Sequence, residues 1–201
     1  MQIIKYTKKG NGNYDILLDN NKKITLSEDL ILKNNLLYKK EVDPYLLEEL
    51  LTENIKYDIY NKCVKYISIR LRSINEIKEY MKRLNADEET INNTIERLLK
   101  NNLLNDEVFT KAFIQDKLNF TTMGPYRIEQ ELKRQHIDNT IISKYLYNID
   151  KDILIIKINK QINKLIKSNK KKDNLKNKIY KNLLSLGYSN DMILKELNKY
   201  F

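Results

Sequence analysis

IKEYMKRLNADEETINNTI, residues 77–95, occurs again in related form at residues 128–146 and 179–197. The later copies read IEQELKRQHIDNTIISKYL and IYKNLLSLGYSNDMILKEL, so each begins 51 residues after the previous one and needs no gap. Five apolar columns coincide in this register, which is more agreement than an Ile- and Leu-rich composition produces by chance. The columns are Ile77 with Ile128 and Ile179, Met81 with Leu132 and Leu183, Ala86 with Ile137 and Tyr188, Ile91 with Ile142 and Ile193, and Ile95 with Leu146 and Leu197.

The repeated stretch has the pattern of helices. Within each copy the apolar residues recur every three or four positions, the period of an α-helix. A helix-capping residue type also recurs in register at Asp87, Asp138 and Ser189. Repeats of this length are typical of small helical units stacked in a row. The predicted helices span 57–71, 73–84, 88–102, 106–120, 125–135, 139–148, 152–168, 173–186 and 190–200.

The first part of the chain differs from the repeats. Residues 3–7 and 14–18 are β-prone runs around Gly and Asn turn residues, which predicts a hairpin, and residues 23–26 can add a third strand. Ser27 is placed to cap a short helix that ends at Asn34-Asn35, and Asp43-Pro44 is placed to begin another.

The predicted fold class is therefore mainly α-helical. It consists of three tandem three-helix repeats in an elongated, curved array, preceded by a small β-hairpin or sheet extension. We divide the chain into a β-rich extension with short helices at 1–55, repeat 1 at 56–105, repeat 2 at 106–150 and repeat 3 at 151–201.

Composition limits the classes of protein. With 41% hydrophobic and 32% charged residues, the chain is too apolar for disorder and too charged for a membrane protein. No apolar run approaches the roughly 20 residues of a spanning helix, and the first residues lack the apolar core of a signal peptide. Cys63 is the single cysteine and reads as a buried small hydrophobe. We expect a cytoplasmic monomer without membrane or disulfide.

The net charge of +10 is unevenly distributed. Residues 151–201 hold 13 basic and 4 acidic side chains, a net +9. A polyanion is the natural partner of such a segment.

Signals for catalysis are weak. His136 is the only histidine and follows a predicted helix end, so a His-based triad or a multi-His metal site is excluded. No Gly-rich phosphate loop is present among the four glycines, and the acidic residues are scattered. We expect a binding protein without enzymatic activity, cofactor or metal.

The candidate binding residues are basic. Ser73 and Glu76 fit a capping box and are interpreted as structural. Arg70 and Arg72 just before it can either neutralise helix-end carbonyls or face a phosphate. The whole candidate set is Arg70, Arg72, Arg83, Arg127, Lys133, Arg134, Lys164, Lys167, Lys170, Lys171 and Lys172.

Each candidate also has a structural interpretation. The Lys run at 164–172 can be a solvated helix end and linker. For Tyr60, Tyr66, Tyr126 and Tyr145, which lie near basic residues in sequence, core packing is favoured over base stacking.

Three motifs in order carry a family resemblance. IRLRSINEI at 69–77, LLNDEVF at 103–109 and GPYRIEQEL at 124–132 resemble the RecX family, regulators of the RecA recombinase. The N-terminal hairpin resembles the extension of Firmicutes-type members. Family members often have Gly after the middle helix, where this chain has Asn85 and Gln135-His136, and Asn tolerates the left-handed geometry.

The resemblance implies a non-catalytic protein that lodges in the groove of the RecA–DNA filament. It implies modulation of strand exchange and ATP hydrolysis, and hence a role in DNA repair, homologous recombination and the SOS response. We expect inhibition of filament growth, although capping, disassembly and stabilisation all need the same kind of surface.

Two alternatives stay open. One is a generic basic repeat protein that binds single-stranded DNA non-specifically and needs no recombinase; it would bind naked DNA as strongly as the filament, with a steep salt dependence. The other is an adaptor that recognises only protein, whose binding would survive removal of the lysines at 164–172.

Overall fold

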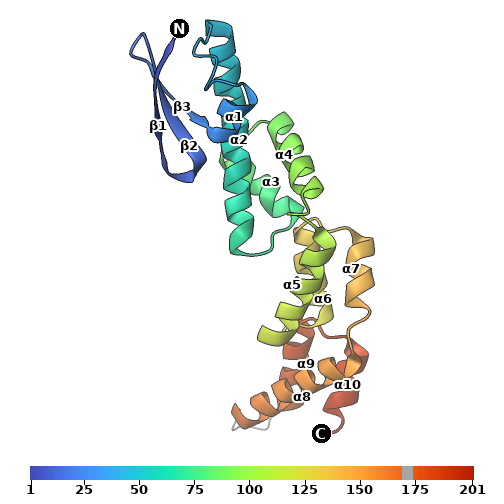
Figure 1. Cartoon of the computed structure of the whole chain (residues 1–201). Helices are drawn as coiled ribbons and strands as arrows, with labels where there is room; N and C mark the ends of the chain where they lie inside the picture. The colour runs from blue at the N-terminus through green and yellow to red at the C-terminus, as the bar shows by residue number, and fades with distance from the viewer. Residues whose placement is uncertain (169–173) are drawn as a thin grey trace. The chain divides into compact units, whose positions relative to one another are not determined.

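The computed structural model describes residues 1–168 and 174–201 (Figure 1). It is mainly helical with a small N-terminal antiparallel sheet, which confirms the predicted fold class. A 3₁₀ turn at Gly10–Gly12 joins the first two strands. The strands are β1 (Ile3–Lys8), β2 (Asn13–Leu18) and β3 (Lys23–Ser27), and the helices are α1 (Glu28–Lys33), α2 (Pro44–Ile69), α3 (Ile74–Arg83), α4 (Glu88–Lys100), α5 (Asp106–Phe120), α6 (Pro125–Arg134), α7 (Asn139–Leu146), α8 (Lys151–Ser168), α9 (Leu175–Ser185) and α10 (Asn190–Leu197).

The described residues form two compact units. The first comprises residues 1–71 and 77–103, and the second comprises residues 72–76 and 104–201. The elongated, curved shape expected for the whole array stays a prediction.

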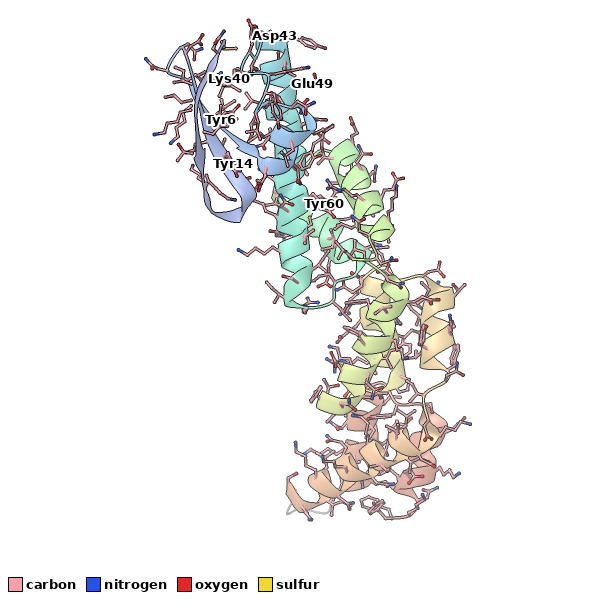
Figure 2. All side chains as sticks on the ribbon, viewed as in Figure 1. Tyr6, Tyr14, Lys40, Asp43, Glu49 and Tyr60 are labelled. Atoms are coloured by element: carbon pink, nitrogen blue, oxygen red, sulfur yellow. The ribbon has the colours of Figure 1, made fainter. Side chains whose placement is uncertain are left out.

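The sheet of the first unit has the strand order β1-β2-β3 and packs on α1 and the start of α2 (Figure 1). Apolar side chains of β2 and β3, among them Ile16 and Leu26, are fully buried in this core. The two tyrosines on the sheet point toward the helices (Figure 2): Tyr6 donates a hydrogen bond to Leu36 O at 2.6 Å and Tyr14 donates to Glu28 at 3.4 Å.

Asp15 on β2 organises the surface of the sheet. Although its side chain is buried, it contacts Lys23 at 2.7 Å, Lys9 at 2.9 Å and the Thr25 hydroxyl at 2.7 Å. Hydrogen bonds from Lys23 and then from Lys9 hold the pKa of this carboxyl well below its ordinary range. The charged form of Asp15 is thus the form that stabilises the folded sheet.

α2 is one helix where the sequence predicts two. Asp43 caps it by accepting from Leu46 N at 2.8 Å, with Pro44 at the first position as expected. The helix then continues through the polar stretch near Asn54, because that side chain bonds β3 instead of interrupting the helix. Asn54 Oδ1 accepts from Ser27 N at 2.8 Å and its Nδ2 donates to Thr25 O at 3.1 Å. The division drawn at residue 55 therefore lies inside a helix, and the four-part division of the chain stays a prediction.

The second half of α2 packs with α4 and carries Cys63 in its buried face. Cys63 is fully buried and burial raises its pKa to about 11, in agreement with its interpretation as a small hydrophobe. The Arg97 guanidinium of α4 lies 3.8 Å from the Tyr60 ring centroid, and Tyr66 stacks on Tyr80 at 4.3 Å.

The repeat columns become core in the structure, except that Ala86 is only half-buried. Ile77, Ile128 and Ile179 are fully buried, and so are the residues of the column four positions later. The capping column is at helix starts in all three copies: Asp87 accepts from Thr90 N, Asp138 accepts from Thr140 N, and Ser189 is the cap residue of α10 without a side-chain bond. Residues that are 51 positions apart in the sequence therefore occupy equivalent positions in the three copies of the structure.

Each middle helix ends in the same way. The second residue after it is left-handed, with φ of 58° at Asn85, 56° at His136 and 92° at Gly187. The following N–H then bonds back five residues, which is the Schellman motif. These bonds join Ala86 to Met81 at 3.1 Å, Ile137 to Leu132 at 3.2 Å and Tyr188 to Leu183 at 3.3 Å.

In the second unit, the end of α9 lies against the start of α6 through backbone atoms. Gly124 N donates to Leu186 O at 2.7 Å, and Tyr126 N donates to Gly187 O at 3.0 Å. A Cβ at Gly124 would lie 2.6 Å from Gly187 C, and one at Gly187 would lie 2.5 Å from Arg127 N. Both positions therefore need glycine, and α5 to α10 share one apolar core around this contact. We call this contact the glycine junction.

A contact equivalent to the glycine junction lies one repeat earlier in the sequence, within the same unit, and is made by polar side chains. The fully buried Ser73, in register with Gly124, donates to Gln135 Oε1 at 3.3 Å. Ile74 N donates to Asp106 at 2.9 Å. In the next copy Pro125 replaces Ile74 and has no N–H, so no acceptor is needed there.

We predict that Gly124→Ala lowers the free energy of unfolding by about 3 kcal/mol, because the new methyl group meets backbone atoms that cannot move aside. Chemical denaturation followed by circular dichroism measures this. Gly10→Ala is the matched control, since nothing lies within 4 Å of its Cβ position, and it should change stability by less than about 0.5 kcal/mol. If the two variants are equally stable, the claim that the glycine junction leaves no room for a side chain at Gly124 is wrong.

We also predict an acid-sensitive contribution from Asp15. Its pKa is lower in the folded chain than the unfolded value of about 3.9, so its stabilisation is complete above about pH 5 and is lost as the pH falls. Urea unfolding of Asp15→Asn should show a deficit at pH 7 that shrinks toward pH 3. The exposed Asp19 has no ion pair among the described residues, and Asp19→Asn is the matched control, which should leave the stability at pH 7 unchanged.

Candidate functional site

The predicted capping box at the start of α3 is present. Glu76 N donates to Ser73 Oγ at 3.1 Å, and Ser73 N donates to the Glu76 carboxylate at 3.1 Å. At the start of α6, Gly124 and Pro125 occupy the cap and first helical positions, also as predicted. These family-motif residues therefore build helix starts.

The two arginines before the capping box have different environments. The Arg72 side chain is only 9% exposed and lies 3.5 Å from Glu76, which makes it part of the buried polar contact at the start of α3. Arg70 is exposed and donates to the neighbouring Leu71 O at 2.8 Å. Of the two interpretations that the sequence leaves open, burial favours a structural role for Arg72, and we leave it out of the proposed binding surface.

The candidate residues of α3 and α6 are at the surface. Arg83 is exposed and lies 5.9 Å from the Tyr80 ring centroid. Arg127 and Arg134 are exposed on α6. Lys133 is paired with Glu129 at 2.6 Å, and this carboxylate raises the pKa of Lys133. Its charge is therefore partly neutralised within the helix.

Two of the repeat 3 candidates, Lys164 and Lys167, are exposed on α8. Lys170, Lys171 and Lys172 lie outside the described residues. Lys160 is also exposed, and Lys157 on the same helix turns inward to donate to Leu118 O and Thr121 O at the end of α5. Neither lysine is among the residues predicted from the sequence, although the spacing of three and four residues from 157 through 160 to 164 places them on one helix face.

Lys157, Lys160 and Lys164 line a groove between α8 and the end of α5. The groove has a volume of about 570 Å³ and is also lined by Phe120, Ile156 and Gln161. Phe120 is 83% exposed and Ile156 66% exposed, which is unusual for such large apolar side chains. We call it the α5–α8 groove.

A second groove of about 510 Å³ lies in the same unit between α6, the end of α7 and the start of α10. Its lining is largely apolar and includes Tyr126, Tyr147 and Tyr188. Of the four tyrosines considered in the sequence, Tyr60, Tyr66 and Tyr145 are half-buried, as core packing predicts, whereas Tyr126 is exposed.

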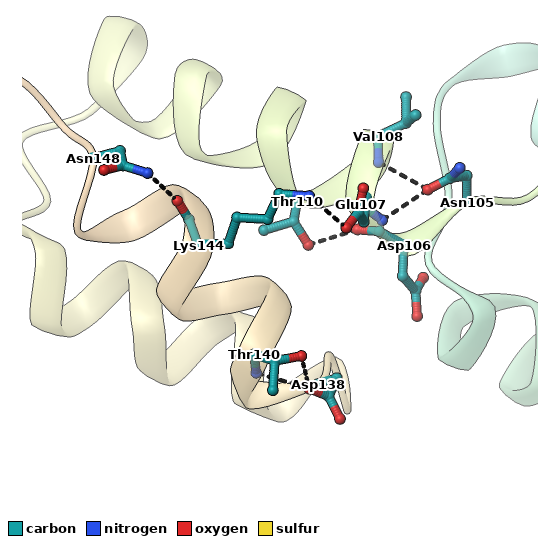
Figure 3. Close-up of polar contacts among 9 residues, drawn as sticks. All are labelled: Asn105, Asp106, Glu107, Val108, Thr110, Asp138, Thr140, Lys144 and Asn148. Carbon is teal, nitrogen blue, oxygen red and sulfur yellow. Dashed lines mark hydrogen bonds and ion pairs between the residues drawn. The ribbon is translucent and has the colours of Figure 1, made fainter.

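On the face formed by α5 and α7, polar side chains form hydrogen bonds and ion pairs with one another and with the helix backbone (Figure 3). Asn105 caps α5 by accepting from Glu107 N at 2.9 Å and Val108 N at 3.1 Å. Lys144 pairs with Glu107 at 2.9 Å, and this carboxylate raises the pKa of Lys144. In repeat 2 this face therefore offers a partner less unpaired positive charge than α8 does.

Across residues 1–168 and 174–201, no cluster of three or more His, Cys, Asp or Glu side chains is arranged to hold a metal ion. In the same residues, no helix combines the length and apolar character that crossing a membrane requires. Together the repeated caps, shared core and open grooves define a helical-repeat protein, the class in which similar units in a row present binding surface.

Two family models match this chain. One describes the first three-helix domain of RecX and matches residues 60–98, and the other describes its second three-helix domain and matches residues 105–146. The regulatory protein RecX of Clostridium beijerinckii is 30% identical over 205 residues, covering 99% of this chain and 94% of that protein. The chain belongs to the RecX family, whose named members are regulatory proteins.

Other RecX proteins are similar to this chain in sequence or in fold. The regulatory protein RecX of Lactococcus lactis subsp. lactis is 33% identical over 176 residues, covering 85% of this chain and 65% of that protein. A crystal structure of regulatory protein RecX shares the fold with a TM-score of 0.78 at 21% identity, covering 95% of this chain and 96% of that one. RecX from Lactobacillus salivarius gives a TM-score of 0.67 at 26% identity, covering 73% and 97%.

We predict that Arg72→Ala lowers the stability of the chain and that Arg70→Ala hardly changes it. Removing the largely buried Arg72 removes its ion pair with Glu76 and should lower the free energy of unfolding by about 2 kcal/mol. Removing the exposed Arg70 should cost less than about 0.5 kcal/mol. Denaturant titration of both variants measures the difference, and equal losses would show that Arg72 is not the structural residue of the pair.

Proposed function

We propose that this chain regulates the RecA recombinase by binding the RecA–single-stranded DNA filament. The observation that carries this proposal is membership of the RecX family, whose first and second domain models match residues 60–98 and 105–146. The chain acts as a monomer in the cytoplasm, without catalysis of its own. Bound to the filament, it lowers filament growth, strand exchange and ATP hydrolysis.

The charge distribution supports a filament as partner. A filament on DNA is a polyanion, and residues 151–201 carry a net +9 of the total +10. The proposed contact residues on the second unit are exposed lysines and arginines of α6 and α8. They are Arg127, Arg134, Lys164 and Lys167, with Lys133 as a partly neutralised neighbour.

Arg70 and Arg83 are the proposed contacts of the first unit. Both are exposed. Lys170, Lys171 and Lys172 lie between the described residues and extend the basic segment in sequence. Backbone phosphates make no demand on base sequence, so these contacts act non-specifically.

The test combines binding and activity. We expect the folded chain to co-sediment with RecA–single-stranded DNA filaments at moderate salt and to lower the DNA-dependent ATPase rate of RecA. Lys164→Gln with Lys167→Gln should weaken both effects, because two phosphate contacts are removed. Lys39→Gln with Lys40→Gln, which removes two exposed lysines from the first unit, is the matched control.

Each alternative gives a different result. Equal affinity for filament and naked DNA, with no effect on ATP hydrolysis at saturation, would favour a generic nucleic-acid-binding protein. Filament binding that is unchanged by the α8 substitutions and by salt would favour a protein-only adaptor. If the folded chain does not co-sediment with RecA–single-stranded DNA filaments at moderate salt, the proposal is wrong.

A further inference from the structure

The α5–α8 groove combines three features that the packing of the repeats does not require. Lys157 lines it and donates to the Leu118 and Thr121 carbonyls at the end of α5. Its rim carries Phe120 and Ile156, whose side chains are largely exposed. In Figure 1 the end of α5 lies next to α8, so the rim residues come from two different helices.

The charge of the groove has one sign. None of the described residues that line it is acidic, whereas Lys157, Lys160 and Lys164 are all present. Lys160 and Lys164 are exposed, and no carboxylate of the described residues pairs with either. Burial, followed by the neighbouring charge of Lys160, lowers the pKa of Lys157. An anion in this groove would meet two available ammonium groups.

The exposed ring of Phe120 indicates which kind of anion the groove can bind. Phe120 presents a flat apolar face beside the lysines, and nucleic-acid bases stack on such faces regardless of their sequence. In duplex DNA the bases are already stacked on one another, so only a single strand offers them. Phosphates spaced along the same strand then match the two lysines, which are one helical turn apart on α8.

We propose that the α5–α8 groove binds single-stranded nucleic acid, with a base stacked on Phe120 and the backbone phosphates at Lys160 and Lys164. This deepens the proposed function, on which it rests, by naming where the chain touches the DNA of the filament. An acidic protein segment with an apolar anchor is the competing occupant. It would use the same charges but would not require a π-face at position 120.

The chain contains no tryptophan, which allows a direct probe. Phe120→Trp in the full chain keeps an aromatic face and introduces a single tryptophan, whose fluorescence can be excited apart from that of the 14 tyrosines. Titration with oligo(dT) of about 20 nucleotides at low salt should quench this fluorescence. It should also give an affinity by anisotropy equal to wild type within about threefold. An oligonucleotide with abasic sites keeps the phosphates and should bind about tenfold more weakly.

Two variants separate stacking from charge. Phe120→Leu keeps an apolar side chain without the ring and should weaken oligo(dT) binding about tenfold. Lys160→Gln with Lys164→Gln should reduce the slope of log affinity against log salt by about 1.4, since each phosphate contact on a single strand contributes about 0.7. Lys181→Gln with Lys195→Gln removes two exposed lysines from α9 and α10 and is the control, with slope and affinity near wild type.

Three results would overturn the inference: no oligo(dT) binding by wild type at low salt, equal binding by Phe120→Leu and wild type, or equal losses in the two double lysine variants. Co-sedimentation with RecA filaments is measured on the same proteins. A chain that binds the filament but fails the oligo(dT) tests retains its proposed function and loses only this site. Loss of filament binding in Phe120→Leu with unchanged oligo(dT) binding would assign the groove to a protein partner.

Discussion

The second unit depends on the hydrogen-bonded approach of the backbone at residues 186–187 to the backbone at 124–126. Two N–H···O bonds join the end of α9 to the start of α6, and neither glycine leaves room for a Cβ. Helix ends normally leave backbone groups unpaired. Here the carbonyls at one helix end satisfy amides at another helix start. The shared core of α5 to α10 can then close around a fixed contact.

Most of the fold can be predicted from the sequence, because the repeats are encoded in local signals. Burial of Ile77, Ile128 and Ile179 follows from helical period and register alone, and so do the caps at Asp87 and Asp138. Left-handed geometry after a middle helix is suggested only by the family resemblance, in which glycine is common at the position of Asn85. The continuity of α2 is not visible in the sequence, because it depends on Asn54 bonding strand β3, a contact between distant parts of the chain.

Less of the candidate site can be predicted. The sequence gives the sign and the location of the charge, so Lys164 and Lys167 are found as exposed cations. It does not tell a buried arginine from an exposed one two residues away, because the burial of Arg72 depends on its contact with Glu76 and on the packing around it. Phe120 is missed because an aromatic residue at a helical spacing normally predicts core. Its exposure arises only where α5 ends beside α8.

The central claim is that the repeats are a scaffold and that the second unit presents the main contact surface. Hydrogen–deuterium exchange of the chain, alone and bound to RecA–single-stranded DNA filaments, tests it most directly. The account predicts new protection in α8 and at the end of α5 around Phe120, with no change in the core amides of the glycine junction. Protection confined to the N-terminal sheet and α1, with α8 exchanging as in the free chain, would contradict it.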